Sequence, residues 1–483
     1  MVAVNTSVGQ TKRVNIPEIT TQGGTWGPML CSNSIDTVGK FAEQDGQFYC
    51  YKKIARIIPL AMVDDLLAVS NCGYESTAIN TTINSLIELK KLKFHTPEPN
   101  KKSKCHYMHI GKSSKWCPGM KVHGVQAEQV EEAVYLGDII RQDGKNTSNI
   151  KSRINKGLGI VTQIMEILKI VSFGSKYFEI AVTLRESLLV NGMLTNAEIW
   201  YGISKSEINE LEDVDKLLMR RVLESPSSSC VESLYLELGI IPISILIKAR
   251  RVNYLHYLVN LSESEMLSKV FKTQWRFPTK DDWTTQVQED LKDFKIDLSL
   301  EEMKSKSKNS FKRLVKIKAK EYALDNLLNL KEKHKKMENL DYTELKLQNY
   351  LKDSEIPPNE ARNLYRFRTR AANFKENCKN SYLSTACPLC FVQPDSQVHC
   401  IQFTIVKLKV KIEGTYNDIF YEKIPSEISK TVLRILQLKE NLLKILNMYL
   451  LSKRPQCINL IDFSEMLQNF NVCMFLILDQ IYI

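Results

Sequence analysis

The chain lacks the features of a membrane or secreted protein. Its apolar tail at residues 472–478 is much shorter than the roughly twenty residues of a transmembrane helix, and Asp479 interrupts it. The polar start at residues 1–12 has no apolar core of a secretory signal, and the 12 cysteines follow no secreted spacing. We therefore expect reduced thiols, no membrane partner, and a location in the nucleus or cytoplasm.

Motifs of several enzyme classes are also missing. No glycine-rich phosphate loop or internal repeat is visible. Apart from His399, which is considered below, the histidines show neither metal-ligand spacing nor a nucleophile partner. What is present is positive charge, because 66 lysines and arginines against 55 acidic residues give a net charge of +11. This charge favours an anionic partner, although composition alone does not separate nucleic acid from an acidic membrane surface. A length of 483 residues predicts about two to four domains.

Two adjacent acids, Asp64 and Asp65, lie between apolar segments at residues 57–63 and 66–69. Apolar runs of this length are typical of short buried strands, so the pair is predicted to occupy the tight turn of a hairpin. Two carboxylates on a rigid turn offer the hard oxygen ligands that Mg²⁺ prefers. The alternative is ordinary turn chemistry, in which Asp serves only the local backbone.

Residues 22–30, with the sequence QGGTWGPML, give the acidic pair a context. Together the two segments resemble the palm of a non-LTR (LINE-like) retrotransposon reverse transcriptase. In that family a Gln-Gly segment ending in Ser-Pro-Leu lies beside the incoming nucleotide, and an aromatic-X-Asp-Asp hairpin follows it. Gly27 replaces the usual serine here, and Met62 replaces the usual aromatic residue. The resemblance implies that Gln22 and Gly23 line a nucleotide pocket and that Asp64 and Asp65 bind Mg²⁺.

Further blocks continue the resemblance in the family's order. Residues 92–112 resemble the next palm block, in which Lys101 and Lys104 are candidate phosphate contacts. Residues 135–140 resemble the strand that leads from palm to thumb, and residues 150–157 resemble the basic helix that opens the thumb. The combined order carries the inference, because each block alone is short.

One carboxylate of the family's polymerase site is missing. The family supplies another metal-binding aspartate upstream of the Gln-Gly segment, whereas the first aspartate of this chain is Asp36. Two-metal catalysis needs bridging carboxylates that hold the ions roughly 3.5–4 Å apart. We therefore expect a polymerase remnant without the fingers or the first catalytic aspartate, inactive in isolation. The family's endonuclease has no visible trace either.

Beyond the palm-like region the pattern becomes helical. Apolar residues recur three or four apart over residues 175–189, and the period resumes at Leu211 after a break at residues 204–206. This part resembles the family's helical thumb and linker. Four arginines in it are predicted to be either solvated or in contact with phosphates: Arg220, Arg221, Arg250 and Arg251.

Two later segments carry much of the positive charge. Residues 304–320 hold a dense run of cations beside a narrow apolar stripe at Phe311, Leu314, Ile317 and Ala323, which suits a solvated linker helix or nucleic-acid binding equally well. In residues 362–370 aromatics alternate with arginines, a combination suited to single-stranded RNA or a primer end. The plain alternative is a helix whose aromatics point inward. The candidate contacts are Arg362, Tyr365, Arg366, Phe367, Arg368 and Arg370.

A Cys-X-X-Cys turn at Cys387 and Cys390, with His399 nine residues later, resembles the family's zinc knuckle. Structural zinc needs four ligands in a tetrahedral cage. The family's fourth ligand, a cysteine, would fall at position 403, which is Phe403. Cys400 and the more distant Cys378 are the candidates to replace it, and a metal-free loop is the alternative.

The resemblance thus implies an α+β fold: an incomplete reverse-transcriptase palm (residues 1–145), a helical thumb and linker (146–260), a basic helical region (261–380), a degenerate zinc knuckle (381–405) and a tail (406–483). The predicted function is that of an impaired RNA-directed DNA polymerase acting on an RNA template, a DNA primer and deoxynucleotide triphosphates with Mg²⁺. The alternative is a non-catalytic RNA- or DNA-binding protein derived from a retroelement.

Overall fold

The protein is described here from a computed structural model. It describes two short strands near the start, most of residues 49–372, and residues 393, 394, 396 and 399. The gaps within residues 49–372 are 52–54, 58–59, 63–64, 71–72, 90–104, 111–119, 123, 172–175, 228, 281, 335–336 and 338–339.

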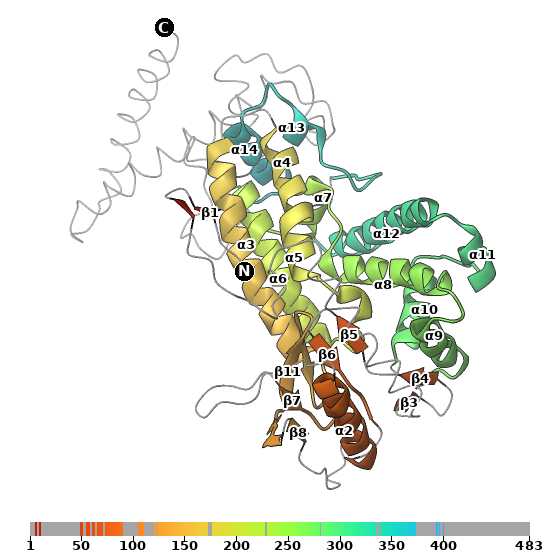
Figure 1. The fold of residues 1–483 in the computed structure, drawn as a ribbon. Coiled ribbons are helices and arrows are strands. Elements are labelled where there is room, and N and C mark those ends of the chain that lie inside the picture. The colour runs from red at the N-terminus through yellow and green to blue at the C-terminus, as the bar shows by residue number, and fades with distance from the viewer. Residues whose placement is uncertain are drawn as a thin grey trace, which may run out of the picture.

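The strands of the described residues form two-stranded pairs and no larger sheet. All of them precede residue 142, and the helices dominate the rest (Figure 1). Five pairs are antiparallel and β7 with β10 is parallel. The strands are β1 (Asn5–Thr6), β2 (Gly9–Gln10), β3 (Tyr49–Tyr51), β4 (Ala55–Ile57), β5 (Leu60–Met62), β6 (Asp65–Leu67), β7 (His106–Tyr107), β8 (Lys121–Val122), β9 (Val125–Gln126), β10 (Glu128–Gln129), β11 (Glu132–Tyr135) and β12 (Asp138–Arg141).

The helices confirm the predicted α+β class at a coarse level, since most of the described chain is helical. One helix, α2, lies among the strands, and the others follow β12. The helices are α2 (Gly73–Leu89), α3 (Thr147–Val171), α4 (Tyr177–Leu184), the π-helical η1 (Arg185–Val190), α5 (Asn191–Met193), the 3₁₀ turn η2 (Ala197–Ile199), α6 (Lys205–Leu223), α7 (Val231–Leu238), α8 (Ile243–Val259), α9 (Met266–Arg276), α10 (Trp283–Asp293), α11 (Leu300–Ser305), α12 (Lys308–Lys331), α13 (Asn349–Lys352) and α14 (Pro358–Arg368).

Strand pair β11–β12 turns through two residues whose φ angles are positive. Tyr135 pairs with Asp138, and the turn residues Leu136 and Gly137 have φ angles of 49° and 81°. Two left-handed residues in a row match the twist of a tight hairpin. Glycine adopts this conformation without strain, whereas Leu136 is held there by the pairing on both sides.

Helix α3 is the long helix that starts the all-helical part. Its buried positions recur every three or four residues and face α6, whose buried stripe has the same period. Gly157 permits a close approach to α5, because a Cβ atom there would lie 2.6 Å from Sδ of Met193. Helix α6 begins where the sequence predicts a break, since Ser204 caps it by accepting a hydrogen bond from the N–H of Glu207.

One continuous apolar core joins the helices from α3 to α14. Its buried side chains run from Ile150 to Ala372, and α8 lies at its centre in contact with α6, α10 and α12. The predicted boundary at residue 260 therefore does not separate two cores. Among the described helices, none is both long and apolar enough to cross a lipid bilayer.

Candidate nucleic-acid interface

The predicted acidic hairpin is present as strand pair β5–β6. Met62 pairs with Asp65, so two residues connect the antiparallel strands. The hairpin lies where the apolar pattern predicts it, but the sequence predicted both acids in the turn, whereas Asp65 begins β6. The side chain of Asp65 is exposed, and Asp64 lies outside the described residues. Burial and then the charge of Asp65 raise the pKa of Tyr135. The hairpin therefore lies beside β11, as Figure 1 also shows.

Asp138, on β12, connects this hairpin region to α3. Its carboxylate accepts hydrogen bonds from Arg153 Nη2 at 2.9 Å and Asn149 Nδ2 at 3.0 Å, and from the side chain of Asn196. Arg153 Nη2 also donates to the carbonyl oxygen of Gly137 at 3.1 Å. Since Arg153 and Asn149 are buried, these contacts fix the angle between the β11–β12 hairpin and α3.

The outer face of α3 near this joint is polar and basic. Lys151, Asn155 and Lys156 are exposed there, and Lys145 precedes the helix. The helix lacks an acidic residue in its first turn. Its N-terminal half therefore presents positive charge beside the hairpin.

Helix α12 carries a stronger concentration of cations. Residues 303–320 contain eight lysines and arginines and no carboxylate, namely Lys304, Lys306, Lys308, Lys312, Arg313, Lys316, Lys318 and Lys320. Lys308, Lys312, Arg313 and Lys316 are exposed on the helix, and we name these four residues the cationic ridge. None of the four forms an ion pair with another described residue. Their positive potential is therefore open to solvent.

The inner face of α12 packs into the core. Its buried positions follow each other at intervals of four: Phe311, Val315, Ala319, Ala323 and Leu327. The predicted stripe was right at Phe311 and Ala323 but wrong at Ile317, which is 48% exposed. The helix packs against α8 and α7 (Figure 1), so it is not a solvated linker. The cationic ridge consequently stands on a fixed support.

The arginine and aromatic residues of α14 follow the plain alternative. Tyr365 and Phe367 are 0% and 1% exposed, so neither can stack on a base in this conformation. The hydroxyl of Tyr365 instead lies within hydrogen-bonding distance of Ser225 and Ser233, at 3.0 and 2.9 Å. The predicted stacking role of both aromatics is thereby corrected, because burial satisfies the rings and the hydroxyl inside the core.

The predicted phosphate contacts on α14 are largely engaged with protein. Arg368 is buried and its Nε lies 3.3 Å from a carboxylate oxygen of Glu237, itself fully buried. Arg362 donates to the carbonyl oxygen of Val222 at 3.0 Å, and Arg366 pairs with Glu224 at 3.0 Å. Arg370 is partly exposed at the end of the helix. Arg362 and Arg368 are therefore structural in this conformation.

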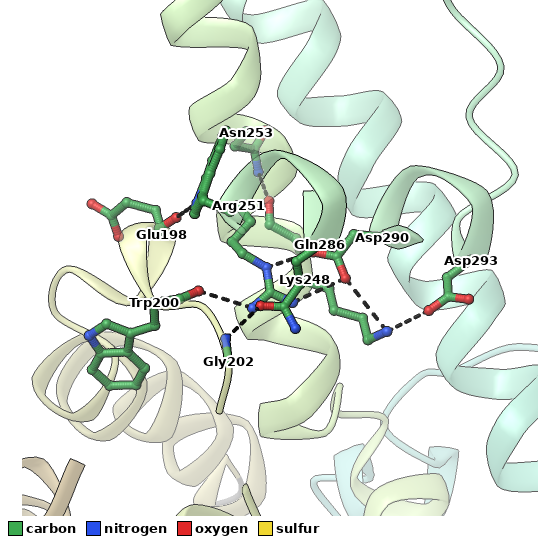
Figure 2. Close-up of polar contacts among 11 residues, drawn as sticks. Glu198, Trp200, Gly202, Lys248, Arg251, Asn253, Gln286, Asp290 and Asp293 are labelled. Atoms are coloured by element: carbon green, nitrogen blue, oxygen red, sulfur yellow. Dashed lines mark hydrogen bonds and ion pairs between the residues drawn. The ribbon is translucent and has the colours of Figure 1, made fainter. Parts of the chain in front are cut away.

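Arg250 and Arg251 also turn out to be structural. Arg251 donates from Nε and Nη2 to the two carboxylate oxygens of Asp290, at 2.7 and 3.1 Å, and from Nη1 to the carbonyl oxygen of Trp200 (Figure 2). Arg250 donates to the carbonyl oxygen of Leu194 at 2.6 Å. Arg251 is buried, so neither the solvated nor the phosphate-bound alternative describes it, and Arg250 is partly buried in its contact with the chain.

Lys248 extends the same network. It lies 3.6 Å from Asp290 and also pairs with Asp293 (Figure 2). Burial acts to lower the pKa of Lys248, but the bond to Asp293 and the charges of both aspartates raise it overall. The network links η2, α8 and α10 within the core rather than forming an open site.

The remaining arginines of this set behave differently from each other. Arg220 donates to the carbonyl oxygens of Pro226 and Ser229, whereas Arg221 is exposed.

Among the predicted zinc ligands, His399 is described, and its backbone N–H donates to Oγ of Ser396 at 3.1 Å. The other predicted site residues lie outside the described residues: Gln22, Gly23, Asp64, Lys101, Lys104, Cys387, Cys390 and Cys400.

The structure also gathers three metal-capable side chains that the sequence did not suggest. Cys230, Glu232 and His334 place one ligand atom each within 4.8 Å of one another. Cys230 and Glu232 flank the start of α7, but His334 is about a hundred residues further along the chain. No local spacing could have connected it to them.

Comparisons with protein-family models, with curated proteins and with solved structures find no match to this chain.

Proposed function

We propose that this chain is a nucleic-acid-binding protein derived from a non-LTR retrotransposon reverse transcriptase, and that it binds RNA or DNA through the cationic ridge of α12. The observation that carries the proposal is the unpaired charge of the ridge on a packed helix. Lysine and arginine that lack carboxylate partners can neutralise phosphates without first breaking an ion pair. Specificity for sequence is not expected from such contacts.

The exposed basic residues of α3 add a second contact region.

The spacing of the cationic ridge on α12 suits an extended polyanion. Its successive positions Lys308, Lys312 and Lys316 lie about 6 Å apart along the helix axis, from the rise of 1.5 Å per residue. A row of cations with this spacing suits a sugar–phosphate backbone better than a small anion. The net charge of +11 supports the same class of partner.

Binding measured across a salt series tests this proposal. The triple variant Lys308→Gln, Lys312→Gln and Lys316→Gln removes three charges from the ridge. Each neutralised phosphate contributes about 0.7–0.9 to the magnitude of the slope of log association constant against log salt concentration. The triple variant should therefore have a slope that is smaller in magnitude by about two to three units. Filter binding of a single-stranded RNA and of a DNA duplex would measure it.

A charge-matched control uses three exposed lysines away from the ridge, changed together: Lys269→Gln, Lys280→Gln and Lys352→Gln. This control should retain most of the slope and affinity. Equal loss in both triple variants would mean that only net charge matters, and it would contradict a dedicated ridge site.

An RNA-directed DNA polymerase remnant that is inactive as an isolated chain is the second candidate, and the pairing of Met62 with Asp65 beside Tyr135 favours it. Asp64 and Asp65 would hold one hydrated Mg²⁺, which is insufficient for the two-ion geometry of nucleotidyl transfer. Primer extension on a homopolymer template, in Mg²⁺ and then Mn²⁺, should therefore give no incorporation. Incorporation that Asp64→Asn abolishes would establish the polymerase instead.

A further inference from the structure

Cys230, Glu232 and His334 form a compact cluster where α7 begins and the chain leaves α12. Sγ of Cys230 lies 2.7 Å from Oε2 of Glu232, and Nε2 of His334 lies 3.4 Å from the same oxygen. Cys230 is the N-cap residue of α7, and His334 follows the end of α12. The two helices pack against each other, so their contact holds the three ligand atoms together.

The donor set is suited to one class of metal. A thiolate, an imidazole and a carboxylate together favour Zn²⁺ and its close analogue Co²⁺ over Mg²⁺ or Ca²⁺, which take oxygen ligands. Ligands about 2.0–2.3 Å from a tetrahedral zinc ion lie roughly 3.3–3.8 Å from each other. The separation of 2.7 Å between Cys230 and Glu232 is shorter than that range, and the separation of 3.4 Å between His334 and Glu232 lies within it. Binding therefore requires the thiol and the carboxylate to move apart by a shift on the order of 1 Å.

Exposure decreases from one side of the cluster to the other. The side chain of His334 is 47% exposed, that of Glu232 is 14% exposed, and Cys230 is buried. A metal bound between them would face protein on the cysteine side and water on the histidine side. Three protein ligands with an open fourth position accessible to water are typical of non-structural zinc sites.

We propose that Cys230, Glu232 and His334 bind a Zn²⁺ ion whose fourth ligand is water, and that this ion links the start of α7 to the end of α12. On binding, the Cys230 thiol gives its proton to solvent and a sulfur–zinc bond replaces the hydrogen bond to Glu232. No electron is transferred. The ion must displace the thiol proton, so affinity should increase with pH.

Cobalt spectroscopy on the full chain tests the site. The protein should carry Cys378→Ser, Cys387→Ser, Cys390→Ser and Cys400→Ser, so that the predicted knuckle contributes no thiolate. Addition of Co²⁺ should then produce the thiolate-to-cobalt absorption of the near ultraviolet and the visible bands of tetrahedral cobalt, at one equivalent. Zn²⁺ should abolish both signals by displacement.

Two variants identify the ligands. Cys230→Ser should remove the thiolate absorption, and His334→Ala should weaken Co²⁺ binding by about tenfold or more. His334 is exposed, so its variant should keep the fold, which circular dichroism would verify. Cys105→Ser and His106→Ala are the matched controls, since they remove a thiol and an imidazole outside the cluster.

The proposal fails if no tetrahedral cobalt spectrum appears, or if the spectrum persists unchanged in both Cys230→Ser and His334→Ala. The three side chains would then form only a hydrogen-bonded group. The readout does not involve nucleic acid, so it is independent of the function proposed for the cationic ridge.

Discussion

Three arginines of this protein lie in the interior, where they neutralise buried carboxylates. Arg185, Arg251 and Arg368 are each less than 10% exposed, and each faces a buried carboxylate, on Asp215, Asp290 and Glu237 respectively. Burial acts to lower the pKa of Arg185, but Asp215 raises it overall. Such a pair is expensive to break, because the remaining charge stays in the interior without a partner.

Loss of Arg368 should therefore be severe. Among the described side chains, Arg368→Met leaves the buried carboxylate of Glu237 with the hydroxyls of Tyr342 and Tyr350 as donors, at 2.7 and 2.9 Å. We expect the free energy of unfolding to fall by about 3–5 kcal/mol. Urea denaturation followed by circular dichroism would measure the loss.

Arg366→Met is the control for this substitution, since Arg366 pairs with Glu224 at the surface. Its cost should be about 0–1 kcal/mol, because solvent screens an exposed pair. Equal costs at positions 366 and 368 would contradict the assignment of Arg368 to the core.

Gly239 is required by both its backbone and its surroundings. Its φ is +65°, and a Cβ atom would lie 2.0 Å from the carbonyl carbon of Lys346. Gly144 has a similar φ of +67° but no atom within 4 Å of that position. Gly144→Ala should cost about 1–2 kcal/mol from the left-handed backbone alone. Gly239→Ala should cost clearly more in the same unfolding assay, and a smaller or equal cost would refute the close approach.

At the scale of elements, capping determines where several helices begin. Asp282 is the N-cap of α10, and its carboxylate accepts hydrogen bonds from the N–H groups of Thr279 at 2.7 Å and Thr285 at 2.9 Å. Burial acts to raise the pKa of Asp282, but these hydrogen bonds lower it well below its usual range. The ionised cap is thus the stabilising form.

The pH dependence of this cap follows from the sign of its shift. A lowered pKa stabilises the fold above the unfolded pKa of about 3.9, and this stabilisation is lost as the pH falls from there. Asp282→Ala should cost about 1–2 kcal/mol at pH 7, and the difference from the wild type should shrink below pH of about 4. Urea unfolding at a series of pH values would measure it.

Ser307→Ala provides an uncharged comparison, since Ser307 caps α12 through its hydroxyl. Its cost should be about 1 kcal/mol and should not depend on pH over the same range. A cost of Asp282→Ala that stays constant down to pH 2 would show that the cap does not depend on ionisation.

At the scale of the whole molecule, one core should make the helical part cooperative. Buried apolar side chains from Ile150 to Ala372 belong to a single cluster, whereas α2 lies outside it and is joined to β8 by hydrogen bonds from Asn80 and Asn84 to Lys121. Residues that share a core tend to open together.

Hydrogen exchange would test this cooperativity. Buried amides of α3, α8 and α12 should share one free energy of opening, and those of α2 should open at a lower one. Native-state exchange in low denaturant, read by mass spectrometry of peptides, would measure each helix. If α12 opened as easily as α2, the cationic ridge would not rest on a fixed support.

Several features could be predicted because their causes are local. The hairpin around Asp65 follows from short apolar runs on either side of two polar residues, and the start of α6 follows from Ser204 and Glu207, which are three residues apart. The cations of residues 304–320 are a matter of composition. The structure was needed only to show which side of α12 these cations occupy.

Other features could not be predicted because their partners are distant in sequence. Alternating aromatics and arginines in α14 suit both a nucleic-acid surface and a core helix. The choice depends on Glu237, 131 residues before Arg368, and on Ser225, 140 residues before Tyr365. The metal-capable cluster likewise depends on the position that His334 takes in the fold after the end of α12.

The sequence by itself determined the excess of positive charge, the acidic hairpin and the helical period after residue 146, because each is a local pattern of side chains. Only the tertiary structure decided which cations face solvent, which arginines neutralise buried carboxylates, and which thiol lies close to an imidazole. Those outcomes depend on packing between helices that are far apart in the chain, and packing is a property of the whole core.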